Sequence, residues 1–223
     1  FYHTNGYVVI KSLFSDEECS DILSRCLAFA ETNFPAILNL DRREPKLREY
    51  MKITKMVSIL ETLQGTEVVG TMSQILFKQA GSAYAKQAWN PHQDNAYPQN
   101  PNGRYLTTNI ALSEQDKENG CLYIFNGSHK EGLYRCEPTP SYREIVGTNP
   151  GNTIAADVLE RFECVDLPMN RGDVLFLHGN VVHGSYPNVS PTRSRPMMQF
   201  TYIDKGEFFV AGKNAKREAI ALH

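Results

Sequence analysis

The chain has 223 residues, of which 41% are hydrophobic and 22% charged, and this composition is that of an ordinary globular protein. Its formal net charge of -2 excludes the electrostatic footprint expected for a nucleic-acid or membrane-surface partner. No apolar run approaches the roughly 18 residues of a membrane-spanning helix. We therefore expect one domain over residues 1–223. The sequence does not predict its oligomeric state.

The cysteines predict neither a disulfide framework nor a structural zinc site, because their number is odd and no C-x-x-C pair occurs. Free thiols on apolar segments are typical of a reducing compartment, and we expect a cytoplasmic protein. The sequence begins at Phe1 rather than Met, so it does not exclude a targeting segment ahead of this residue. The five are Cys19, Cys26, Cys121, Cys136 and Cys164.

The first third of the chain predicts a strand at residues 7–10 and then helices. Ser15 and Glu18 have the spacing of a capping box. Residues 34–45 hold two prolines and a charged run, and predict a loop that is either a solvated surface or part of a substrate entrance. A second helix is expected over residues 47–60, with Gly65 close after its end. The first helix carries an apolar stripe at three- and four-residue steps, formed by Cys19, Ile22, Leu23, Cys26, Leu27 and Ala30.

From residue 67 the apolar period changes to that of β-strands. Residues 133–157, rich in Pro, Gly, Thr and Asn, predict a long functional or mobile loop, and residues 214–222 predict a terminal helix. Helices followed by many short strands predict a mainly β fold, a double-stranded β-helix (jelly roll, cupin-like) core buttressed by N-terminal and C-terminal helices. Strands are expected at residues 68–69, 74–77, 105–112, 121–125, 162–167, 174–177 and 197–203.

One extended segment places His92 and Asp94 two residues apart. Side chains alternate faces along a strand, so this imidazole and carboxylate would point the same way and grip one side of a metal ion. A second histidine would complete the two-histidine, one-carboxylate site of non-haem Fe(II) oxygenases, whereas the alternative is a polar loop. Spacing alone leaves His178 and His183 as candidates, both just after the strand at residues 174–177.

Four collinear segments resemble the phytanoyl-CoA dioxygenase family. They are PHQD, ENGCLYIFNGSHKEG, RGDVLFLHGNVVHGSYPNVS and RSRPMMQFTY. The resemblance runs from about residue 1 to residue 203 and is looser in the N-terminal NGYVVIKSLFSDEEC. It implies an enzyme that uses Fe(II) and 2-oxoglutarate. His92 and Asp94 match the His-x-Asp pair of the family, and His183 matches its distal histidine, which leaves His178 as a neighbour.

The resemblance also implies a basic residue, shortly after the distal histidine, that binds the far carboxylate of 2-oxoglutarate. An arginine suits this role because it stays charged when buried and meets a carboxylate with two hydrogen bonds. Arg195 and Arg193 compete for it, with a surface ion pair as the alternative for either. We favour Arg195 because its distance along the chain from Tyr202 fits the family better.

Other residues receive weaker assignments. Ser185 is a hydrogen-bond donor for the same carboxylate, and Trp89 is a lid or wall of the substrate site. Gln93 and Asn188 are expected to hold loops in place. Gln74, Asn109 and Thr107 have two interpretations. They contact the cosubstrate, or they are polar residues of the barrel whose hydrogen bonds are satisfied within it.

These features predict an Fe(II)/2-oxoglutarate-dependent dioxygenase that hydroxylates an unactivated C–H of a small metabolite. It would consume O₂, release succinate and CO₂, and accept ascorbate as a reductant. Asp94 favours hydroxylation over halogenation, because related halogenases have a small residue there. Desaturation, epimerisation and ring chemistry stay open.

Two other hypotheses remain. One is a cupin-like isomerase or hydrolase that uses the same three metal ligands without 2-oxoglutarate, and the other is a catalytically silent jelly-roll binding module. The substrate itself is not specified by the sequence. A polar metabolite such as a free amino acid is favoured over a CoA ester, because no basic cluster for CoA phosphates is evident.

Overall fold

The computed structural model describes residues 1–30, 36–86, 88–139, 151–213 and 215–223. Most of its regular structure is β, which confirms the predicted fold class. The helices are α1 (Tyr2–Asn5), α2 (Asp16–Leu27), α3 (Pro45–Met51), α4 (Thr54–Gln64) and α6 (Ala156–Leu159). The strands are β1 (Tyr7–Ile10), β2 (Ala36–Leu38), β3 (Val68–Leu76), β4 (Trp89–His92), β5 (Tyr105–Ala111), β6 (Leu122–Phe125), β7 (Cys136–Thr139), β8 (Gly151–Ile154), β9 (Cys164–Leu167), β10 (Val174–His178), β11 (His183–Ser185) and β12 (Met197–Asp204).

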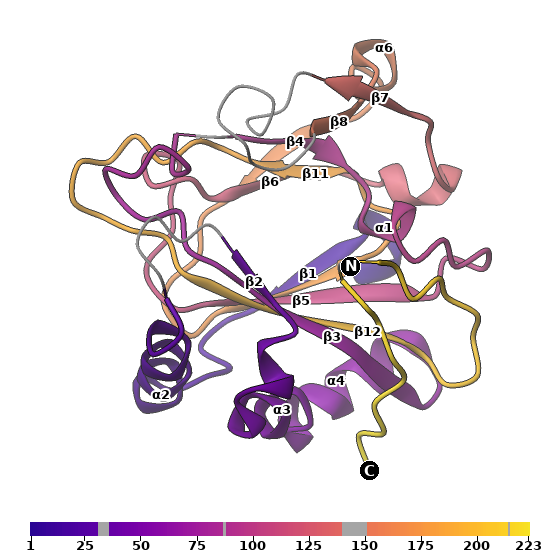
Figure 1. Cartoon of the computed structure of the whole chain (residues 1–223). Coiled ribbons are helices and arrows are strands. Elements are labelled where there is room, and N and C mark those ends of the chain that lie inside the picture. Colours follow the sequence, from indigo (N-terminus) through magenta and orange to yellow (C-terminus); the bar gives the residue numbers. More distant parts are fainter. Residues whose placement is uncertain (31–35, 87, 140–150, 214) are drawn as a thin grey trace.

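Two antiparallel sheets face each other (Figure 1). The larger has the order β1-β10-β5-β12-β3-β2, and the smaller has the order β4-β11-β6-β9. Strands that are distant in sequence are therefore neighbours in each sheet, as in a jelly roll. β7 and β8 pair only with each other, and Figure 1 shows them beyond the smaller sheet. Among the described residues, no helix is both long and apolar enough to cross a membrane.

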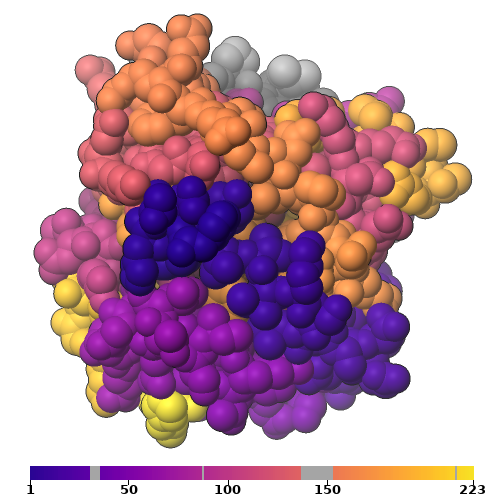
Figure 2. Space-filling view, turned by 180° about the vertical axis from the view of Figure 1, so that it is seen from behind, coloured from indigo at the N-terminus to yellow at the C-terminus, as the bar shows by residue number. Residues whose placement is uncertain are grey.

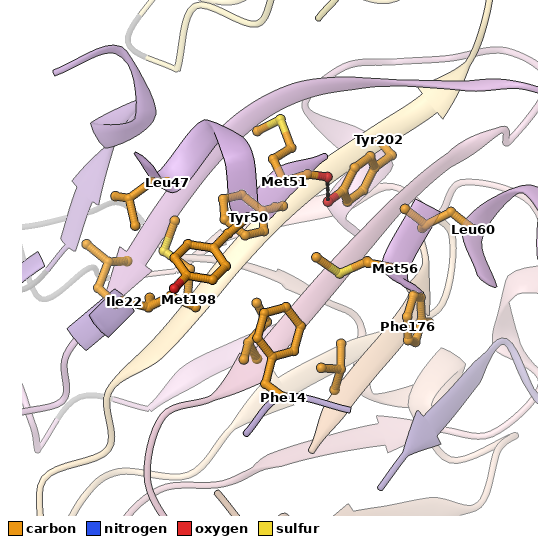
Figure 3. Close-up of a cluster of buried hydrophobic side chains, with 14 of the residues drawn as sticks. Phe14, Ile22, Leu47, Tyr50, Met51, Met56, Leu60, Phe176, Met198 and Tyr202 are labelled. Carbon is orange, nitrogen blue, oxygen red and sulfur yellow. Dashed lines mark hydrogen bonds between the residues drawn. The ribbon is translucent and has the colours of Figure 1, made fainter. Parts of the chain in front are cut away.

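The N-terminal helices α2, α3 and α4 cover the outer face of the larger sheet (Figure 1). Seen from behind, the indigo and purple surface of this part of the chain spreads over the lower half of the molecule (Figure 2). The predicted capping box starts α2, because Ser15 Oγ accepts from the Glu18 amide and Glu18 accepts from the Ser15 amide. Side chains of the helices and of the sheet form one buried hydrophobic core between them. It includes Ile22, Met56, Leu60, Phe176 and Tyr202 (Figure 3).

Strand alternation separates this core from the space between the sheets. In β5, Leu106 and Ile110 belong to the helix-covered core, whereas Tyr105 and Asn109 face a cavity between the sheets. The neighbouring strand β12 follows the same rule, and β3 follows it on each side of a register shift at Thr71. The larger sheet thus has an apolar outer face and a mixed inner face, and the inner face carries the site.

The structure corrects three predicted elements. The second helix is two helices, because Ile53 adopts an extended backbone and Tyr202 Oη donates to the Met51 carbonyl at 3.0 Å. The predicted loop at residues 133–157 contains β7, β8 and the start of α6, although residues 140–150 lie outside the described part. Of the predicted loop at residues 34–45, residues 34–35 also lie outside the described part, and residues 36–38 form the edge strand β2.

The predicted C-terminal helix is wrong for the described residues after 214. The Gly70 and Ile220 backbones exchange hydrogen bonds of 2.9 and 2.8 Å, so the chain returns to β3 in an extended form. Ile220 and Leu222 are buried two residues apart, which is the period of a strand. A Cβ on Gly70 would lie 2.4 Å from Met51 Sδ and 3.4 Å from Leu222 Cδ2, so the glycine leaves room for both side chains.

The apolar stripe of α2 is narrower than predicted, and this offers a matched pair of variants. Ile22 is fully buried, whereas Leu27 is 51% exposed. We expect Ile22→Ala to lower the free energy of unfolding by about 2–5 kcal/mol through the cavity it creates. Leu27→Ala should change it by no more than about 0.5 kcal/mol. Urea denaturation measures both, and equal effects would contradict the observed packing.

Candidate metal centre and cosubstrate pocket

The two candidate histidines come together because β4 pairs with β11. In this antiparallel pair His92 and His183 lie directly opposite each other, and their ring centroids are 4.4 Å apart. Asp94 follows β4 at the first position of a short 3-10 helix, Asp94–Ala96. One potential ligand atom from each of the three residues lies within 4.8 Å of the others. The structure thus assembles the predicted triad.

The strand that carries His183 tolerates only a glycine between its two inward-facing residues. A Cβ on Gly184 would lie 2.4 Å from Tyr123 Oη and 2.5 Å from the Trp89 carbonyl. These atoms belong to the two strands that flank β11 in the smaller sheet. The glycine therefore keeps β11 close to both neighbours while His183 and Ser185 face the cavity.

Backbone carbonyls orient both imidazoles. His92 Nδ1 lies 2.7 Å from the Asn90 carbonyl and His183 Nδ1 lies 3.1 Å from the Val181 carbonyl. A carbonyl oxygen only accepts, so each Nδ1 carries a proton, and in the neutral ring each Nε2 keeps its lone pair. The Nε2 atoms lie 3.6 and 3.7 Å from Asp94 Oδ1. Two lone pairs and one carboxylate therefore converge on a common point.

The ionisation of the triad suits a metal ligand set. Burial alone would raise the pKa of Asp94, but His183, His92 and a 2.8 Å hydrogen bond from Thr107 hold it below its ordinary value. Burial lowers the pKa of His183 to about 4 against the opposing charge of Asp94. Asp94 is thus charged and His183 neutral near pH 7, which are the forms that bind a cation.

The triad opens into a cavity of about 800 Å³ between the sheets. Its walls come from both sheets, from β2 and from the C-terminal segment. Besides the triad, the lining includes the polar or aromatic residues Gln74, Tyr84, Trp89, Tyr97, Tyr105, Asn109, Ser185, Arg195, Gln199, Thr201, Lys213 and Arg217. A site of this size, with few charges among apolar walls, is typical of small-molecule binding.

Arg195 is the cation of the cavity interior. The residue is 1% exposed, and Nη1 lies 3.6 Å from Met197 Sδ. Nε has no hydrogen-bond partner, and no carboxylate of the described residues pairs with the guanidinium. Burial lowers its pKa to about 10, so it stays charged at neutral pH. A buried charge of this kind calls for an anion.

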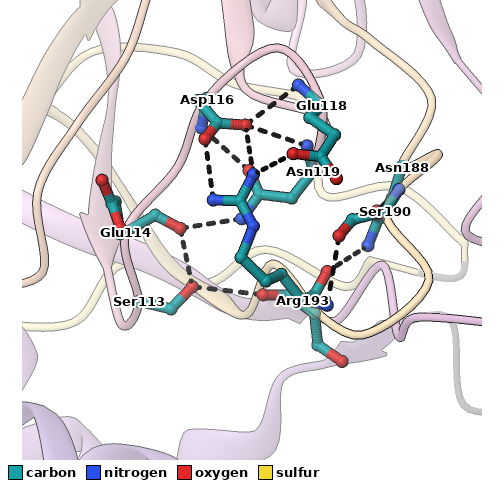
Figure 4. A network of polar contacts seen from close by, with 9 residues as sticks. Ser113, Glu114, Asp116, Glu118, Asn119, Asn188, Ser190 and Arg193 are labelled. Carbon is teal, nitrogen blue, oxygen red and sulfur yellow. Dashed lines mark hydrogen bonds and ion pairs between the residues drawn. The ribbon is translucent and has the colours of Figure 1, made fainter.

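Arg193 lies outside the cavity, two residues earlier, although both arginines have the same strand parity. Its guanidinium donates to Asp116 at 2.7 and 3.0 Å and to Glu118 at 2.7 Å (Figure 4). Asn188 donates to the Arg193 carbonyl at 2.8 Å, as its predicted loop-holding role requires. This ion-pair cluster satisfies Arg193, and it ties the loop before β12 to the turn after β5.

Ser185 lines the cavity near Arg195, and a lysine that sequence reasoning missed supports it. Lys78 Nζ donates to Ser185 Oγ at 2.8 Å and to the Tyr186 carbonyl. Burial, together with the nearby Arg195, holds the pKa of Lys78 well below its ordinary value. Because the amine donates to Ser185 Oγ, the serine hydrogen remains available to the cavity. The only sequence signal was a lysine that ends an apolar strand.

The weaker candidates divide between the cavity and its supports. Gln74 and Asn109 line the cavity, where Asn109 Oδ1 accepts from Gln199 at 3.2 Å and Asn109 Nδ2 has no partner. Thr107 does not line it but holds Asp94. Trp89 forms part of the wall, with its ring centroid 6.1 Å from that of His92.

His178 takes no part in the triad. It ends β10, with its ring centroid 4.9 Å from that of His129, and its Nδ1 accepts from the Asn180 amide at 3.0 Å. The ambiguity left by spacing is thus resolved geometrically, since His183 alone of the two faces Asp94.

Comparison with known proteins agrees with this geometry. The family model for phytanoyl-CoA dioxygenase matches residues 2–197. The chain belongs to the phytanoyl-CoA dioxygenase family. Phytanoyl-CoA dioxygenase 1 of Oryza sativa subsp. japonica is 30% identical over 169 residues, covering 74% of this chain and 55% of the relative. Phytanoyl-CoA dioxygenase domain-containing protein 1 of Danio rerio is 31% identical over 155 residues, covering 66% and 49%. The chain therefore spans about half the length of these relatives.

Solved structures share the fold of this family member. The epimerase SnoN, in complex with Fe³⁺, alpha ketoglutarate and nogalamycin RO, has a TM-score of 0.76 at 20% identity, covering 100% of this chain and 93% of its own. EctD from S. alaskensis, with 2-oxoglutarate and 5-hydroxyectoine, has a TM-score of 0.74 at 18% identity, covering 98% and 82%. At these identities the likeness establishes the jelly-roll fold, which was the prediction.

The triad predicts how single substitutions change metal binding. We expect His183→Ala to reduce Fe(II) or Mn(II) affinity by at least about 100-fold, because one of three ligands is lost. His178→Ala is the matched control and should bind metal like the parent protein. Anaerobic metal titration followed by calorimetry measures both affinities. The reverse pattern would show that His178 is the ligand.

Proposed function

We propose that this chain is an Fe(II)/2-oxoglutarate-dependent dioxygenase that hydroxylates an unactivated C–H of a small metabolite. One observation carries the proposal: the His92, Asp94 and His183 triad and the unpaired, buried Arg195 line the same cavity. The triad offers a site for a divalent metal, and Arg195 offers a site for a carboxylate. The cosubstrate 2-oxoglutarate has a metal-chelating end and a carboxylate end.

The residues fit the metal and cosubstrate that the family implies. Two neutral imidazole nitrogens and a carboxylate oxygen are the facial ligand set of non-haem Fe(II) oxygenases, which leaves coordination positions open. When bound, iron with 2-oxoglutarate and O₂ supplies the oxidising chemistry and releases succinate and CO₂. Asp94 occupies the third ligand position, so the proposal favours hydroxylation over halide transfer.

The chain's own groups would position the cosubstrate and the metal ligands. Arg195 can hold the far carboxylate with two hydrogen bonds, and the Ser185 hydroxyl can add a third. Thr107 fixes one oxygen of Asp94 and leaves Oδ1 facing both histidines. Arg195 and His183 are both buried, so their charged and polar atoms face the cavity rather than the outer surface. Such fixed donors need no rearrangement when the ligand binds.

Other outcomes on the same scaffold are distinguishable. Among the structural neighbours are the epimerase SnoN and the carbocyclase SnoK, so hydroxylation is the proposed outcome rather than a consequence of the fold. A cupin-like isomerase or hydrolase without 2-oxoglutarate would have no use for an unpaired arginine at the inner end. The buried Arg195 therefore favours the dioxygenase.

Succinate formation tests the proposal directly. The protein is incubated with Fe(II), 2-oxoglutarate, O₂ and ascorbate in the presence of a metabolite library. We expect succinate above the no-enzyme background, and a product heavier than its substrate by one oxygen atom. A protein that binds iron yet forms no succinate with any library member would refute the dioxygenase assignment. A product of unchanged mass alongside succinate would exclude hydroxylation only.

The two arginines predict different responses to 2-oxoglutarate. We expect Arg195→Gln to raise the apparent KM for 2-oxoglutarate by about 10- to 100-fold, the effect of losing hydrogen bonds to a charged group. Arg193→Gln should leave this KM within about twofold and instead lower stability. Succinate release against 2-oxoglutarate concentration gives both values. A large KM increase in the Arg193 variant would reverse the assignment.

A further inference from the structure

The C-terminal segment after β12 closes over one side of the cavity. It crosses the larger sheet beside β3 (Figure 1), where Ile220 pairs with Gly70 and the Glu218 amide donates to the Thr71 carbonyl at 3.1 Å. Nearer the cavity, Asn39 donates to the Ala215 carbonyl. The Arg217 amide also donates to the Ala211 carbonyl at 2.7 Å. These bonds fix a loop whose Lys213 and Arg217 belong to the cavity wall.

Arg217 is a half-buried cation held on an aromatic surface. Its Nε lies 3.4 Å from Tyr105 Oη, and its guanidinium carbon lies 5.9 Å from the centroid of the same ring. A Cβ on Gly212 would lie 3.2 Å from Arg217 Nη1, so the guanidinium also packs on that glycine. The side chain is therefore positioned by contacts that leave its other N–H groups without a carboxylate.

The acidic neighbour of Arg217 is already engaged. Glu218 lies 3.5 Å from Arg42 and 3.4 Å from Arg48. Within the described ranges, no Asp or Glu forms an ion pair with Arg217 or Lys213. The exposed Lys213 lies on the same loop. The outer end of the cavity thus presents two cations with no acid between them.

Arg217 and Arg195 have different surroundings within the cavity. Arg195 lies near Tyr84, Cys121 and Lys78, and is fully buried. Arg217 lies on Tyr105. Burial and the charge of Asp94 raise the pKa of Tyr97, and the charge of Arg217 lowers it. Tyr97 is 46% exposed, so this end is open to solvent. One arginine therefore serves the closed end of the cavity and the other serves its entrance.

We propose that Arg217, assisted by Lys213, binds an oxyanion group of the substrate, a carboxylate or a phosphate, at the entrance of the cavity. The inference rests on the proposed function, because it treats this cavity as the place where substrate meets the triad. A guanidinium fixed on a tyrosine can meet an oxyanion with two hydrogen bonds, and the exposed Lys213 adds a second charge. The aromatic faces of Tyr97 and Tyr105 favour an anion attached to an apolar or planar body.

Trp89 fluorescence gives a test that does not depend on turnover. Trp89 is the only tryptophan and lines the cavity. The metal-loaded protein with 2-oxoglutarate, kept anaerobic, is titrated with probe pairs: 3-phenylpropionate, phenethyl phosphate and their neutral partner 3-phenylpropanamide. We expect saturable quenching by at least one anion and at least tenfold weaker binding of the amide. The carboxylate and phosphate arms identify which oxyanion is preferred.

Substitutions assign the effect to Arg217. We expect Arg217→Gln to weaken anion binding by about 10- to 100-fold, and Arg217→Lys to retain part of it. Lys205→Gln, which removes an exposed charge paired with Glu67, is the matched control and should bind like the parent. Unchanged anion affinity in Arg217→Gln, equal affinity for the amide, or no quenching by either anion would overturn the inference.

Measuring the 2-oxoglutarate affinity of the variants separates a failure of this inference from a failure of the proposed function. Arg217→Gln should keep the parent affinity for 2-oxoglutarate, measured by the visible charge-transfer band of the anaerobic iron complex, whereas Arg195→Gln should lose it. If Arg217→Gln lost it too, Arg217 would belong to the cosubstrate site and the inference would fail. Anion binding at Arg217 in a protein without 2-oxoglutarate affinity would instead refute the proposed function alone.

Discussion

The metal-binding geometry depends on one strand pairing, that of β4 with β11. It places His92 opposite His183 and brings both Nε2 atoms to within 3.7 Å of Asp94 Oδ1. The pairing is possible because Gly184 has no side chain where Tyr123 Oη and the Trp89 carbonyl lie. Thr107 then reaches Asp94 from the larger sheet. The site therefore joins the two sheets at one point, and any change in their separation would alter the ligand geometry before it altered the fold.

The larger sheet supports this site by placing apolar residues on its outer face and polar residues on its inner face. Outward residues such as Phe200 and Tyr202 pack under the N-terminal helices, and they fix the sheet without entering the cavity. Inward residues such as Gln199 and Thr201 are free to be polar, because Gln199 bonds to Asn109 of β5 and Thr201 bonds to Thr71 of β3. A single-residue slip in register would exchange the two sets and place polar groups under the helices. Stability and function thus use opposite faces of the same strands.

Local sequence patterns predicted most of the strands and the metal-binding segment. The features that they did not predict depend on contacts between residues that are distant in the sequence. His92 and Asp94 share one segment, so alternation sufficed, and the strands of the core were visible as apolar runs. His178 and His183 could not be separated by spacing, because the turn between them decides which one faces Asp94. Arg193 and Arg195 share parity, and only Asp116 and Glu118 draw the first away. The C-terminal segment was predicted as a helix because Gly70, its partner, lies 150 residues earlier in the sequence.

The charges of the cavity explain why an anion is needed at each end. With the proposed divalent iron, Asp94 cancels one of its two positive charges, and Arg195 adds another in a buried setting where an unpaired ion is costly. A dicarboxylate that spans the metal and Arg195 would cancel the remainder, which leaves the inner end neutral once the cosubstrate is bound. Arg217 and Lys213 lie outside that balance. Their positive charge persists after the interior has been neutralised, so it can still attract a negatively charged molecule to the entrance.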